Sequence, residues 1–353
     1  MATPVSRRNV STLVAGDNFV TNRLLLDALA IQCGNALDIR EYTFDWPNVP
    51  FGPVAEVKEA SGSEEQMLAL IPGVEVVVSE MAPMTRRVIE AADALKLIII
   101  CRGGPVNVNI DAATERGIPV CFSPARNATA TAEYTIGLLL AAMRRLAEGH
   151  RDLKQGVWRG DFYAYEDAGS ELEGKTVGLI GFGAVGSRVA KVLHAFGAEV
   201  LVADPYVRPE QVEAVGGTIC TLEELLPRAY AISLPARLTP ETHHIIGREE
   251  IAKLPKGAVL INSARGGLLD YDAVCDALDS GHLRAAAFDV YDPEPPAPDS
   301  RLFTTPNITF SPHIAGASRE TAERAAIIAA DEVGRYLRGE PLANVSNPST
   351  VGR

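Results

Sequence analysis

The sequence predicts an α/β protein built from two doubly wound parallel-sheet domains. Short apolar runs typical of strands alternate with helix-like runs along most of the 353 residues, and such alternation indicates βα units and a parallel sheet. A glycine-rich turn, GFGAVG, lies at residues 181–186 within that pattern. A chain of this length accommodates about two domains, so we expect two sheets in tandem rather than one long sheet.

The alternation begins near the N-terminus and resumes after the glycine turn. The first predicted domain has strands at 11–15, 74–79, 97–101 and 119–122 and helices at 24–31, 85–94 and 111–116. Further strands are expected at 229–234, 258–262, 284–289 and 308–311. Residues 319–337 form a last predicted helix, which we expect to return to the first domain.

The segment between the two predicted domains is an apolar helix. Residues 130–145, ATAEYTIGLLLAAMRR, are apolar on most faces, which is typical of a buried connecting helix or of a subunit interface. Both interpretations stay open at this point. Trp158 and Tyr163, which follow the segment, are expected to be packing residues.

The glycine turn has the properties of a dinucleotide-binding loop. A buried strand is predicted at 176–180, a helix from Val185 to Gly197, and a second strand at 199–203. Gly181 would permit the tight turn, Gly183 the approach of a pyrophosphate, and Gly186 close packing of helix on strand. Amides at the start of the helix would hold the pyrophosphate. We therefore assign the loop to cofactor binding, through Gly181, Gly183, Ala184, Val185 and Gly186.

An acidic residue follows the loop at the distance that this kind of site requires. Asp204 ends the second strand, 18 residues after Gly186, where a carboxylate accepts hydrogen bonds from the adenosine ribose hydroxyls. The same charge would repel a 2′-phosphate. Since no arginine follows directly, the sequence favours NAD over NADP, and Arg208 keeps NADP as the alternative.

Three loops of the second half each present one polar residue directly after a predicted strand. They are Arg265 in NSARGG, Glu294 in DVYDPEP and His313 in SPHIAGAS. The carboxyl ends of strands in a doubly wound sheet face the ligand crevice, so we expect these side chains to form a catalytic group. The alternatives are a surface ion pair for Arg265, a solvated Glu294 and a packed core histidine.

These residue types suit the reduction of a carbonyl group. The Arg265 guanidinium could hold a substrate carboxylate with two parallel hydrogen bonds and also reach the adjacent carbonyl oxygen. An imidazolium at His313 could protonate the developing alkoxide and act as the base in the reverse direction. Glu294 is the expected carboxylate partner that keeps this imidazole protonated.

The four motifs, in this order, resemble those of the D-isomer-specific 2-hydroxyacid dehydrogenases. ELEGKTVGLIG (171–181), LTPETHHII (238–246) and NATATAEYTIGLLL (127–140) add to the resemblance. It implies that residues 1–128 and 318–353 form a flavodoxin-like substrate-binding domain. Residues 129–317 would be a Rossmann NAD-binding domain with a dimerisation helix, and the active site would lie in the cleft between the two domains. The short form expected here has no regulatory domain after Arg353.

The resemblance also implies further cofactor contacts. Asp289 would hydrogen-bond the nicotinamide carboxamide, and its alternative is a cap at the end of a strand. Ser233, Ala264 and Gly316 are further expected contacts.

The substrate loop departs from the pattern of the family. Relatives often have a glycine-rich loop of G-x-D-N character, whereas residues 101–111 read CRGGPVNVNID. Arg102 could meet a distal anionic group or form a surface salt bridge, and Asn107 could bind a hydroxyl of a sugar-acid chain. Pro235 and Arg237 stand where relatives often have His and Pro. The expected substrate contacts are Arg102, Gly104, Pro105, Val106, Asn107 and Arg265.

Composition excludes several classes of partner. The net charge of −12 disfavours binding to nucleic acid or to an anionic membrane surface. Five widely spaced cysteines without a CxxC pair indicate neither disulfides nor zinc, and His194, His243, His244 and His282 are expected to be structural or solvated, so no metal is expected. Arg7 and Arg8 precede only a short strand-like stretch, which predicts no secretory signal and a cytoplasmic protein. The family resemblance implies a homodimer, and the expected partner is a small anionic substrate.

The leading functional hypothesis is NAD-dependent interconversion of a 2-oxo acid and a D-2-hydroxy acid. A polar or phosphorylated chain is favoured over plain lactate, for example 3-phosphoglycerate, hydroxypyruvate or glyoxylate. Formate dehydrogenases share the architecture but differ at the acidic partner of the histidine, so Glu294 argues against them. Phosphite oxidation and an NAD-sensing corepressor that resembles C-terminal-binding proteins remain as alternatives, because fold alone does not decide function.

Overall fold

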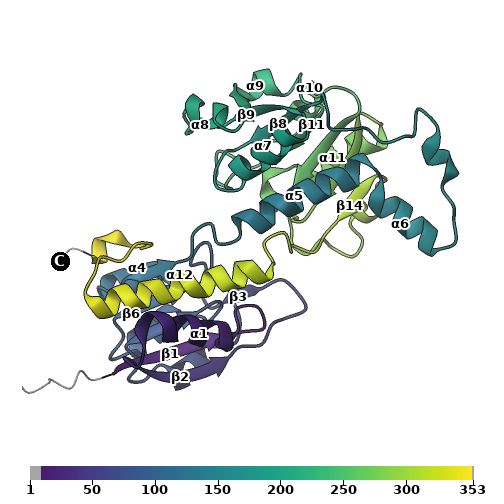
Figure 1. The fold of residues 1–353 in the computed structure, drawn as a ribbon. Helices are drawn as coiled ribbons and strands as arrows, with labels where there is room; N and C mark the ends of the chain where they lie inside the picture. The colour runs from purple at the N-terminus through teal and green to yellow at the C-terminus, as the bar shows by residue number, and fades with distance from the viewer. Residues whose placement is uncertain (1–8, 352–353) are drawn as a thin grey trace, which may run out of the picture. The chain divides into compact units, whose positions relative to one another are not determined.

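The computed structural model describes residues 9–351, so the Arg7 and Arg8 pair lies outside the described residues. The chain forms two compact units (Figure 1). Unit 1 comprises Met1–Asn127 and Ser318–Arg353, and unit 2 comprises Ala128–Ala317. Each unit has its own parallel sheet.

Unit 1 contains a five-stranded parallel sheet in the order β2-β1-β5-β6-β7. Taken in chain order, this is the 2-1-3-4-5 arrangement of flavodoxin-like folds. The two central strands read VVVS and LIII and are fully buried, as expected where helices cover both faces of a sheet. The strands are β1 (Val10–Gly16), β2 (Leu37–Thr43), β5 (Val76–Ser79), β6 (Leu97–Ile100) and β7 (Val120–Phe122).

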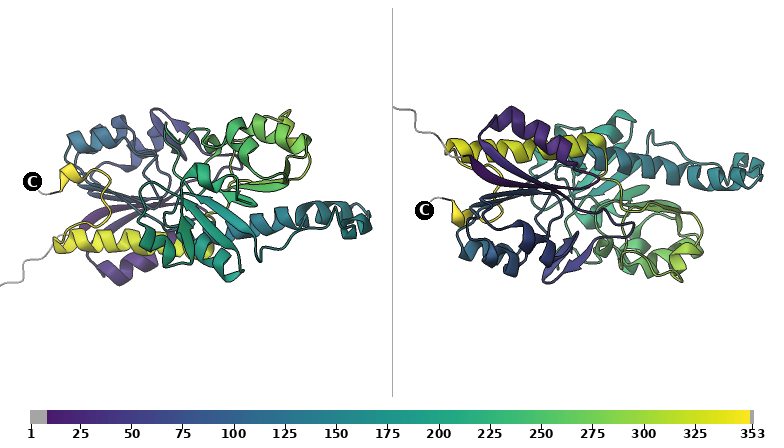
Figure 2. Two further views of the ribbon diagram at one scale, coloured as in Figure 1. Left: turned by 90° about the horizontal axis from the view of Figure 1, so that it is seen from above. Right: turned by 90° about the horizontal axis from the view of Figure 1, so that it is seen from below.

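Helices cover both faces of the unit 1 sheet. The long helix α12 (Arg319–Arg338) lies beside α1 (Asn22–Cys33) (Figures 1 and 2). A row of buried alanines in α12 packs in one hydrophobic core with residues of α1 and of the sheet. The core of the other face includes α2 (Glu64–Leu70), α3 (Arg86–Ala91) and α4 (Ile110–Glu115). An antiparallel ribbon, β3 (Gly52–Val54) with β4 (Val57–Ala60), completes the unit.

Unit 2 contains a seven-stranded parallel sheet in the order β10-β9-β8-β11-β12-β13-β14. Its first six strands follow the 3-2-1-4-5-6 arrangement of a dinucleotide-binding fold. The strands are β8 (Thr176–Ile180), β9 (Glu199–Ala203), β10 (Gly217–Ile219), β11 (Ala231–Ser233), β12 (Ala258–Asn262), β13 (Leu283–Phe288) and β14 (Ile308–Phe310).

The helices of unit 2 pack in two hydrophobic cores. One core includes α5 (Ala128–Met143) and α7 (Gly186–Ala195). The other includes α9 (Leu222–Leu225), α10 (Arg248–Lys253) and α11 (Tyr271–Asp279), and α8 (Pro209–Glu213) contacts β10. Residues Ala132, Ile136 and Leu139 of α5 are buried, which fits the buried-helix interpretation of this segment.

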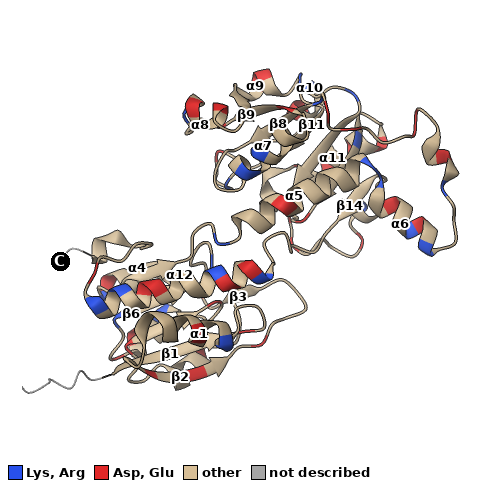
Figure 3. Ribbon diagram, viewed as in Figure 1, with Lys and Arg blue, Asp and Glu red and all other residues tan. Residues whose placement is uncertain are grey.

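An arm follows α5 and projects from the body of unit 2 (Figures 1 and 2). It consists of α6 (Leu146–Lys154), the 3-10 turn η1 (Gly160–Tyr163) and the residues around them. Trp158 and Tyr163 are 82% and 94% exposed, so the expectation that they pack inside the protein is wrong. Along α6 and α12, basic and acidic residues are interspersed (Figure 3).

One edge strand of unit 1 has no apolar run in its sequence. The edge strand β2 reads LDIREYT and is exposed at most positions, so it has no apolar run, and neither β2 nor α2 was expected. No helix among residues 9–351 is long and apolar enough to span a membrane.

Candidate active site

The glycine turn of unit 2 adopts a conformation that only glycine allows at its first position. Gly181 has φ +106°, and a Cβ there would lie 2.9 Å from the Cα of Ala236. A Cβ at Gly186, the first residue of α7, would lie 2.6 Å from the carbonyl oxygen of Gly181. Gly183 differs, because a Cβ there would meet no atom within 4 Å. The loop is thus closed against the protein on one side and open where a pyrophosphate would lie.

Asp204 lies against this loop. One carboxylate oxygen accepts a hydrogen bond from the backbone N–H of Phe182 at 2.7 Å, and the other accepts from the N–H of Tyr206 at 2.8 Å. The carboxylate is therefore fixed at the end of β9 beside the glycine turn. A ribose bound along the loop would meet a localised negative charge there.

The three predicted catalytic residues follow three neighbouring strands. Strands β12, β13 and β14 pair in that order, and Arg265, Glu294 and His313 lie in the loops after their carboxyl ends. Parallel pairing brings these three ends to one edge of the sheet, which is where a doubly wound sheet binds its ligand.

Glu294 and His313 form a hydrogen-bonded pair. The Nδ1 atom of His313 lies 2.5 Å from Oε1 of Glu294. The other oxygen of Glu294 accepts from the backbone N–H of Tyr291 at 3.3 Å. The imidazole side chain is 46% exposed, so its Nε2 atom is available to a substrate while the carboxylate fixes the ring orientation.

A buried carboxylate holds the loop that carries His313. Asp289 is fully buried and accepts hydrogen bonds from the Ser311 hydroxyl at 2.5 Å and from the N–H groups of Ile314 and Ala315 at 2.9 and 2.7 Å. Asp289 thus acts as the strand-ending cap given above as its alternative, and its expected contact with the cofactor stays a prediction. The cap explains how His313 keeps a left-handed backbone, at φ +55°, which costs energy for a residue other than glycine.

Two tyrosines reinforce the same loop. The Tyr291 hydroxyl lies 2.8 and 3.1 Å from the carbonyl oxygens of Ser311 and Phe288, with one hydrogen shared between these acceptors, and the hydroxyls of Tyr134 and Ser311 lie 2.6 Å apart. Sequence reasoning missed these supporting residues, although Tyr291 stands inside the DVYDPEP motif. Their partners lie in other elements, so no local pattern points to them.

Arg265 extends from a loop that is locked by glycine packing. Its guanidinium is exposed and donates to the Ala264 carbonyl at 2.6 Å, while its own carbonyl accepts from the Asn262 side chain at 2.8 Å. A Cβ on Gly266 would lie only 1.8 Å from the carbonyl oxygen of Tyr291. The arginine loop therefore packs directly on the backbone that leads to Glu294.

The other expected cofactor contacts occupy strand ends or loops of unit 2. Ser233 is buried at the end of β11, and Ala264 and Gly316 are partly buried. Pro235 packs beside the glycine turn, since a Cβ on Gly186 would lie 3.2 Å from its side chain.

The predicted substrate loop lies in unit 1, and its Arg102 and Asn107 side chains each donate a hydrogen bond to another residue of the protein. Arg102 donates to Glu59 at 2.6 Å, which is the ion pair given above as its alternative. Asn107 is fully buried and donates to the Ala82 carbonyl at 2.8 Å. Gly104, Pro105 and Val106 form the turn between them and are partly exposed.

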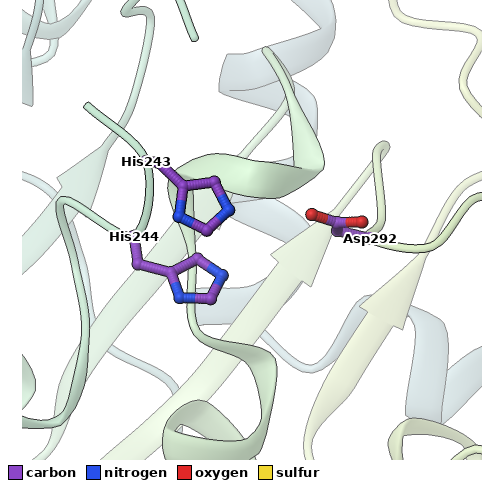
Figure 4. A group of neighbouring side chains, drawn as sticks. All are labelled: His243, His244 and Asp292. Atoms are coloured by element: carbon purple, nitrogen blue, oxygen red, sulfur yellow. The ribbon is translucent and has the colours of Figure 1, made fainter. Parts of the chain in front are cut away.

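Two adjacent histidines and an aspartate come close together at the surface of unit 2 (Figure 4). One ligand atom each of His243, His244 and Asp292 lies within 4.8 Å of the others, and all three residues are exposed. Histidine and carboxylate are ligands of divalent metals. The two imidazole rings are stacked, with centroids 4.0 Å apart and planes 22° apart.

Comparison with known proteins identifies similar sequences and folds. Residues 136–315 match the family model for the NAD-binding domain of D-isomer specific 2-hydroxyacid dehydrogenases. A D-3-phosphoglycerate dehydrogenase of Methanocaldococcus jannaschii is 43% identical over 84% of this chain, which spans only 56% of that relative. The chain thus covers about half the length of this relative.

Two further comparisons cover almost all of the matched protein. A glyoxylate reductase of Korarchaeum cryptofilum is 33% identical over 83% of this chain and 89% of its own length. The crystal structure of the TT0316 protein from Thermus thermophilus superimposes with a TM-score of 0.78 at 32% identity, covering 95% of this chain and 99% of that one.

Proposed function

Because the chain belongs to the D-isomer specific 2-hydroxyacid dehydrogenase family, we propose that it is an enzyme that transfers a hydride between NAD(H) and a 2-oxo acid or D-2-hydroxy acid pair. The observation that carries this proposal is the Glu294–His313 hydrogen bond at 2.5 Å, on loops beside that of Arg265. A corepressor-like protein of this fold can keep the same residues, so turnover of a 2-oxo acid is the observation that separates the two functions.

The chain's own residues supply binding, orientation and a proton. The Arg265 guanidinium holds the substrate carboxylate and polarises the adjacent carbonyl. His313, fixed through Nδ1, delivers a proton from Nε2 to the carbonyl oxygen as it becomes an alkoxide, and accepts that proton in the reverse direction. Bound NAD(H) supplies or accepts the hydride.

The residues of unit 2 fit this cofactor. The family match assigns NAD binding to residues 136–315, and the free space at Gly183 beside the first turn of α7 suits a pyrophosphate. We propose that Asp204 favours NAD over NADP, since the fixed carboxylate would repel a 2′-phosphate. Ala184, Val185, Ser233, Ala264, Asp289 and Gly316 are proposed as further contacts.

Substrate recognition is proposed to involve the carboxyl ends of the unit 1 strands. The relatives are a phosphoglycerate dehydrogenase and a glyoxylate reductase by name, so small 2-oxo acids are the substrates to test first. The assay follows NADH oxidation at 340 nm with glyoxylate, hydroxypyruvate and pyruvate. Absence of turnover with the whole panel, together with NADH binding, would favour the corepressor-like alternative.

We also propose a homodimer formed through the arm of unit 2. Its side chains Trp158, Tyr163 and Tyr165 are 82%, 94% and 93% exposed, and exposed aromatic groups of this kind mark protein interfaces. Within the arm, the guanidinium carbons of Arg145 and Arg159 each lie 4.0 Å from the ring centroid of Phe162.

Sedimentation velocity tests the dimer. The substitution Trp158→Asp is expected to shift the protein from dimer to monomer, whereas Trp46→Phe in unit 1 should leave the dimer intact. A wild-type monomer at micromolar concentration would contradict the proposal.

A cytoplasmic location is also proposed, and the five free cysteines support it because thiols remain reduced there.

A further inference from the structure

Unit 1 contains a group of charged residues at the ligand-binding edge of its sheet. Asp17 follows β1, Glu80 follows β5, and Arg102 lies two residues after β6. Arg126 lies beyond β7, and Glu59 lies in β4. We call these five residues the acid–arginine cluster. Carboxyl ends of parallel strands are where a sheet of this type binds its ligand, so the cluster bears directly on substrate choice.

Both arginines of the cluster are neutralised by carboxylates of the same unit. Arg126 donates to Glu80 at 2.6 Å, and the two side chains are 10% and 3% exposed. Arg102 donates to Glu59 at 2.6 Å. Asp17 is also buried, and burial raises the pKa of its carboxyl against the opposing backbone hydrogen bonds from Phe19 and Val20 and the charges of both arginines.

The cluster therefore carries no net positive charge. Three carboxyl groups face two guanidinium groups, and burial together with the neighbouring Asp17 raises the pKa of Glu80 to about 7 against the opposing charges of Arg126 and Arg102. Whether Glu80 is ionised or protonated, the total charge is zero or negative. A phosphate group would have to break an existing ion pair to gain an arginine, and would then lie beside carboxylates.

Several buried polar atoms of this region lack a protein partner. They are Oδ2 of Asp17, Oε2 of Glu80, Oδ1 of Asn107, Oγ of Ser123, and Nε and Nη1 of Arg126. Only two other side chains within residues 9–351, Thr131 and Tyr230, have such atoms. Buried polar groups normally find a partner, so both acceptors and donors remain to be satisfied here. A hydroxyl group can do both, because it donates one hydrogen bond and accepts two.

We propose that the acid–arginine cluster determines specificity by accepting an uncharged, hydroxyl-bearing substrate chain and rejecting its phosphate ester. This inference rests on the proposed dehydrogenase function and names its substrate class, a non-phosphorylated hydroxylated 2-oxo acid. It departs from the printed name of the M. jannaschii relative, which is a D-3-phosphoglycerate dehydrogenase. Glu80 and Glu59 are the specificity-determining side chains, because each accepts a hydrogen bond from one arginine.

The test compares hydroxypyruvate with its phosphate ester as substrates of the full chain. The wild-type protein is expected to have a kcat/KM about tenfold or more higher for hydroxypyruvate, since like charges at close range are strongly unfavourable. The variants Glu59→Gln and Glu80→Gln each free one arginine, and we expect each to shift the ratio of kcat/KM towards the phosphate ester by about tenfold, mainly through KM.

A matched control separates this effect from a general change in charge. Glu90→Gln removes a carboxylate of unit 1 that pairs with Arg86 on the surface, where the two side chains are 59% and 41% exposed, and its substrate ratio should equal that of the wild type. Circular dichroism checks that each variant is folded. Glu59 is 42% exposed, so its variant is expected to fold even where Glu80→Gln does not.

The outcomes distinguish this inference from the proposed function. A wild-type preference for the phosphate ester, or an unchanged ratio in a folded Glu59→Gln variant, would overturn the specificity inference and leave the dehydrogenase function standing. Failure of every 2-oxo acid to oxidise NADH would overturn both. A preference for hydroxypyruvate that Glu59→Gln reduces would support the inference.

Discussion

The packing of Gly266 against the Tyr291 carbonyl predicts that a single methyl group will disable the site. In Gly266→Ala, the new Cβ would start 1.8 Å from that oxygen, whereas ordinary contacts begin near 3.4 Å. The backbone must therefore separate by about 1.6 Å to restore a normal contact. Both contacting segments are backbone, so no side chain can rotate away, and the displacement falls on the loop that carries Arg265.

A displacement of this size is large for a catalytic group. Misplacement by about 1 Å can cost about 10²-fold in rate, which corresponds to about 2.7 kcal/mol of transition-state stabilisation. We expect kcat/KM for the 2-oxo acid to fall by about 10²-fold or more, while the dissociation constant of NADH changes little because the glycine turn lies elsewhere. Steady-state kinetics and fluorescence titration of NADH measure the two effects.

The control is a glycine with free space around it. A Cβ on Gly137 in α5 would meet nothing within 4 Å, so Gly137→Ala should keep full activity and stabilise the helix by about 0.5–1 kcal/mol. If Gly266→Ala keeps a kcat/KM within threefold of the wild type, then the Arg265 loop is not held by this contact and the reasoning is wrong.

Three further predictions concern the cofactor loop, the catalytic pair and the buried acid of unit 1. Gly183→Ala should raise the KM for NADH without lowering the melting temperature, because its methyl group would occupy free space in the protein; an unchanged KM would argue against a pyrophosphate there. His313→Ala should lower kcat by about 10²- to 10⁴-fold, whereas Arg265→Ala should mainly raise the KM of the substrate, and the reverse pattern would exchange their roles. Since burial raises the pKa of Glu80 from 4.5 to about 7, the folded state holds a proton that the unfolded state loses first, so the free energy of unfolding should fall as pH rises from about 4.5 to 7, by an amount on the order of 3 kcal/mol. Urea titrations at pH 5 and 8 measure this change in the free energy of unfolding. Glu80→Gln should reduce the change, and a free energy of unfolding that rises with pH would contradict the prediction.

Sequence patterns located the buried strands more accurately than the exposed ones. The five residues of β12 are all buried, and the predicted segment 258–262 coincides with Ala258–Asn262. The edge strand β2 is exposed at most positions, and it has a neighbouring strand on one side only. An apolar run reports burial on both faces, so an edge strand of polar residues gives no such signal.

The candidate site likewise has residues that the sequence predicts and supporting contacts that it does not predict. Arg265, Glu294 and His313 could be selected from sequence because each polar residue directly follows an apolar strand. The support that Asp289 gives to the His313 loop through Ser311 joins residues of two neighbouring strands, and no spacing along the chain predicts it.

The sequence alone determined the glycine turn with its following acid, the alternation of strands and helices, and the identity of the three polar residues at strand ends. Only the tertiary structure decided that Arg102 pairs with Glu59, 43 residues away, and that Arg126 pairs with Glu80, 46 residues away. Local backbone preferences and burial periodicity are properties of neighbouring residues and can be read along the chain. Charge pairing depends on which strands lie side by side, and that order is fixed only when the whole sheet assembles.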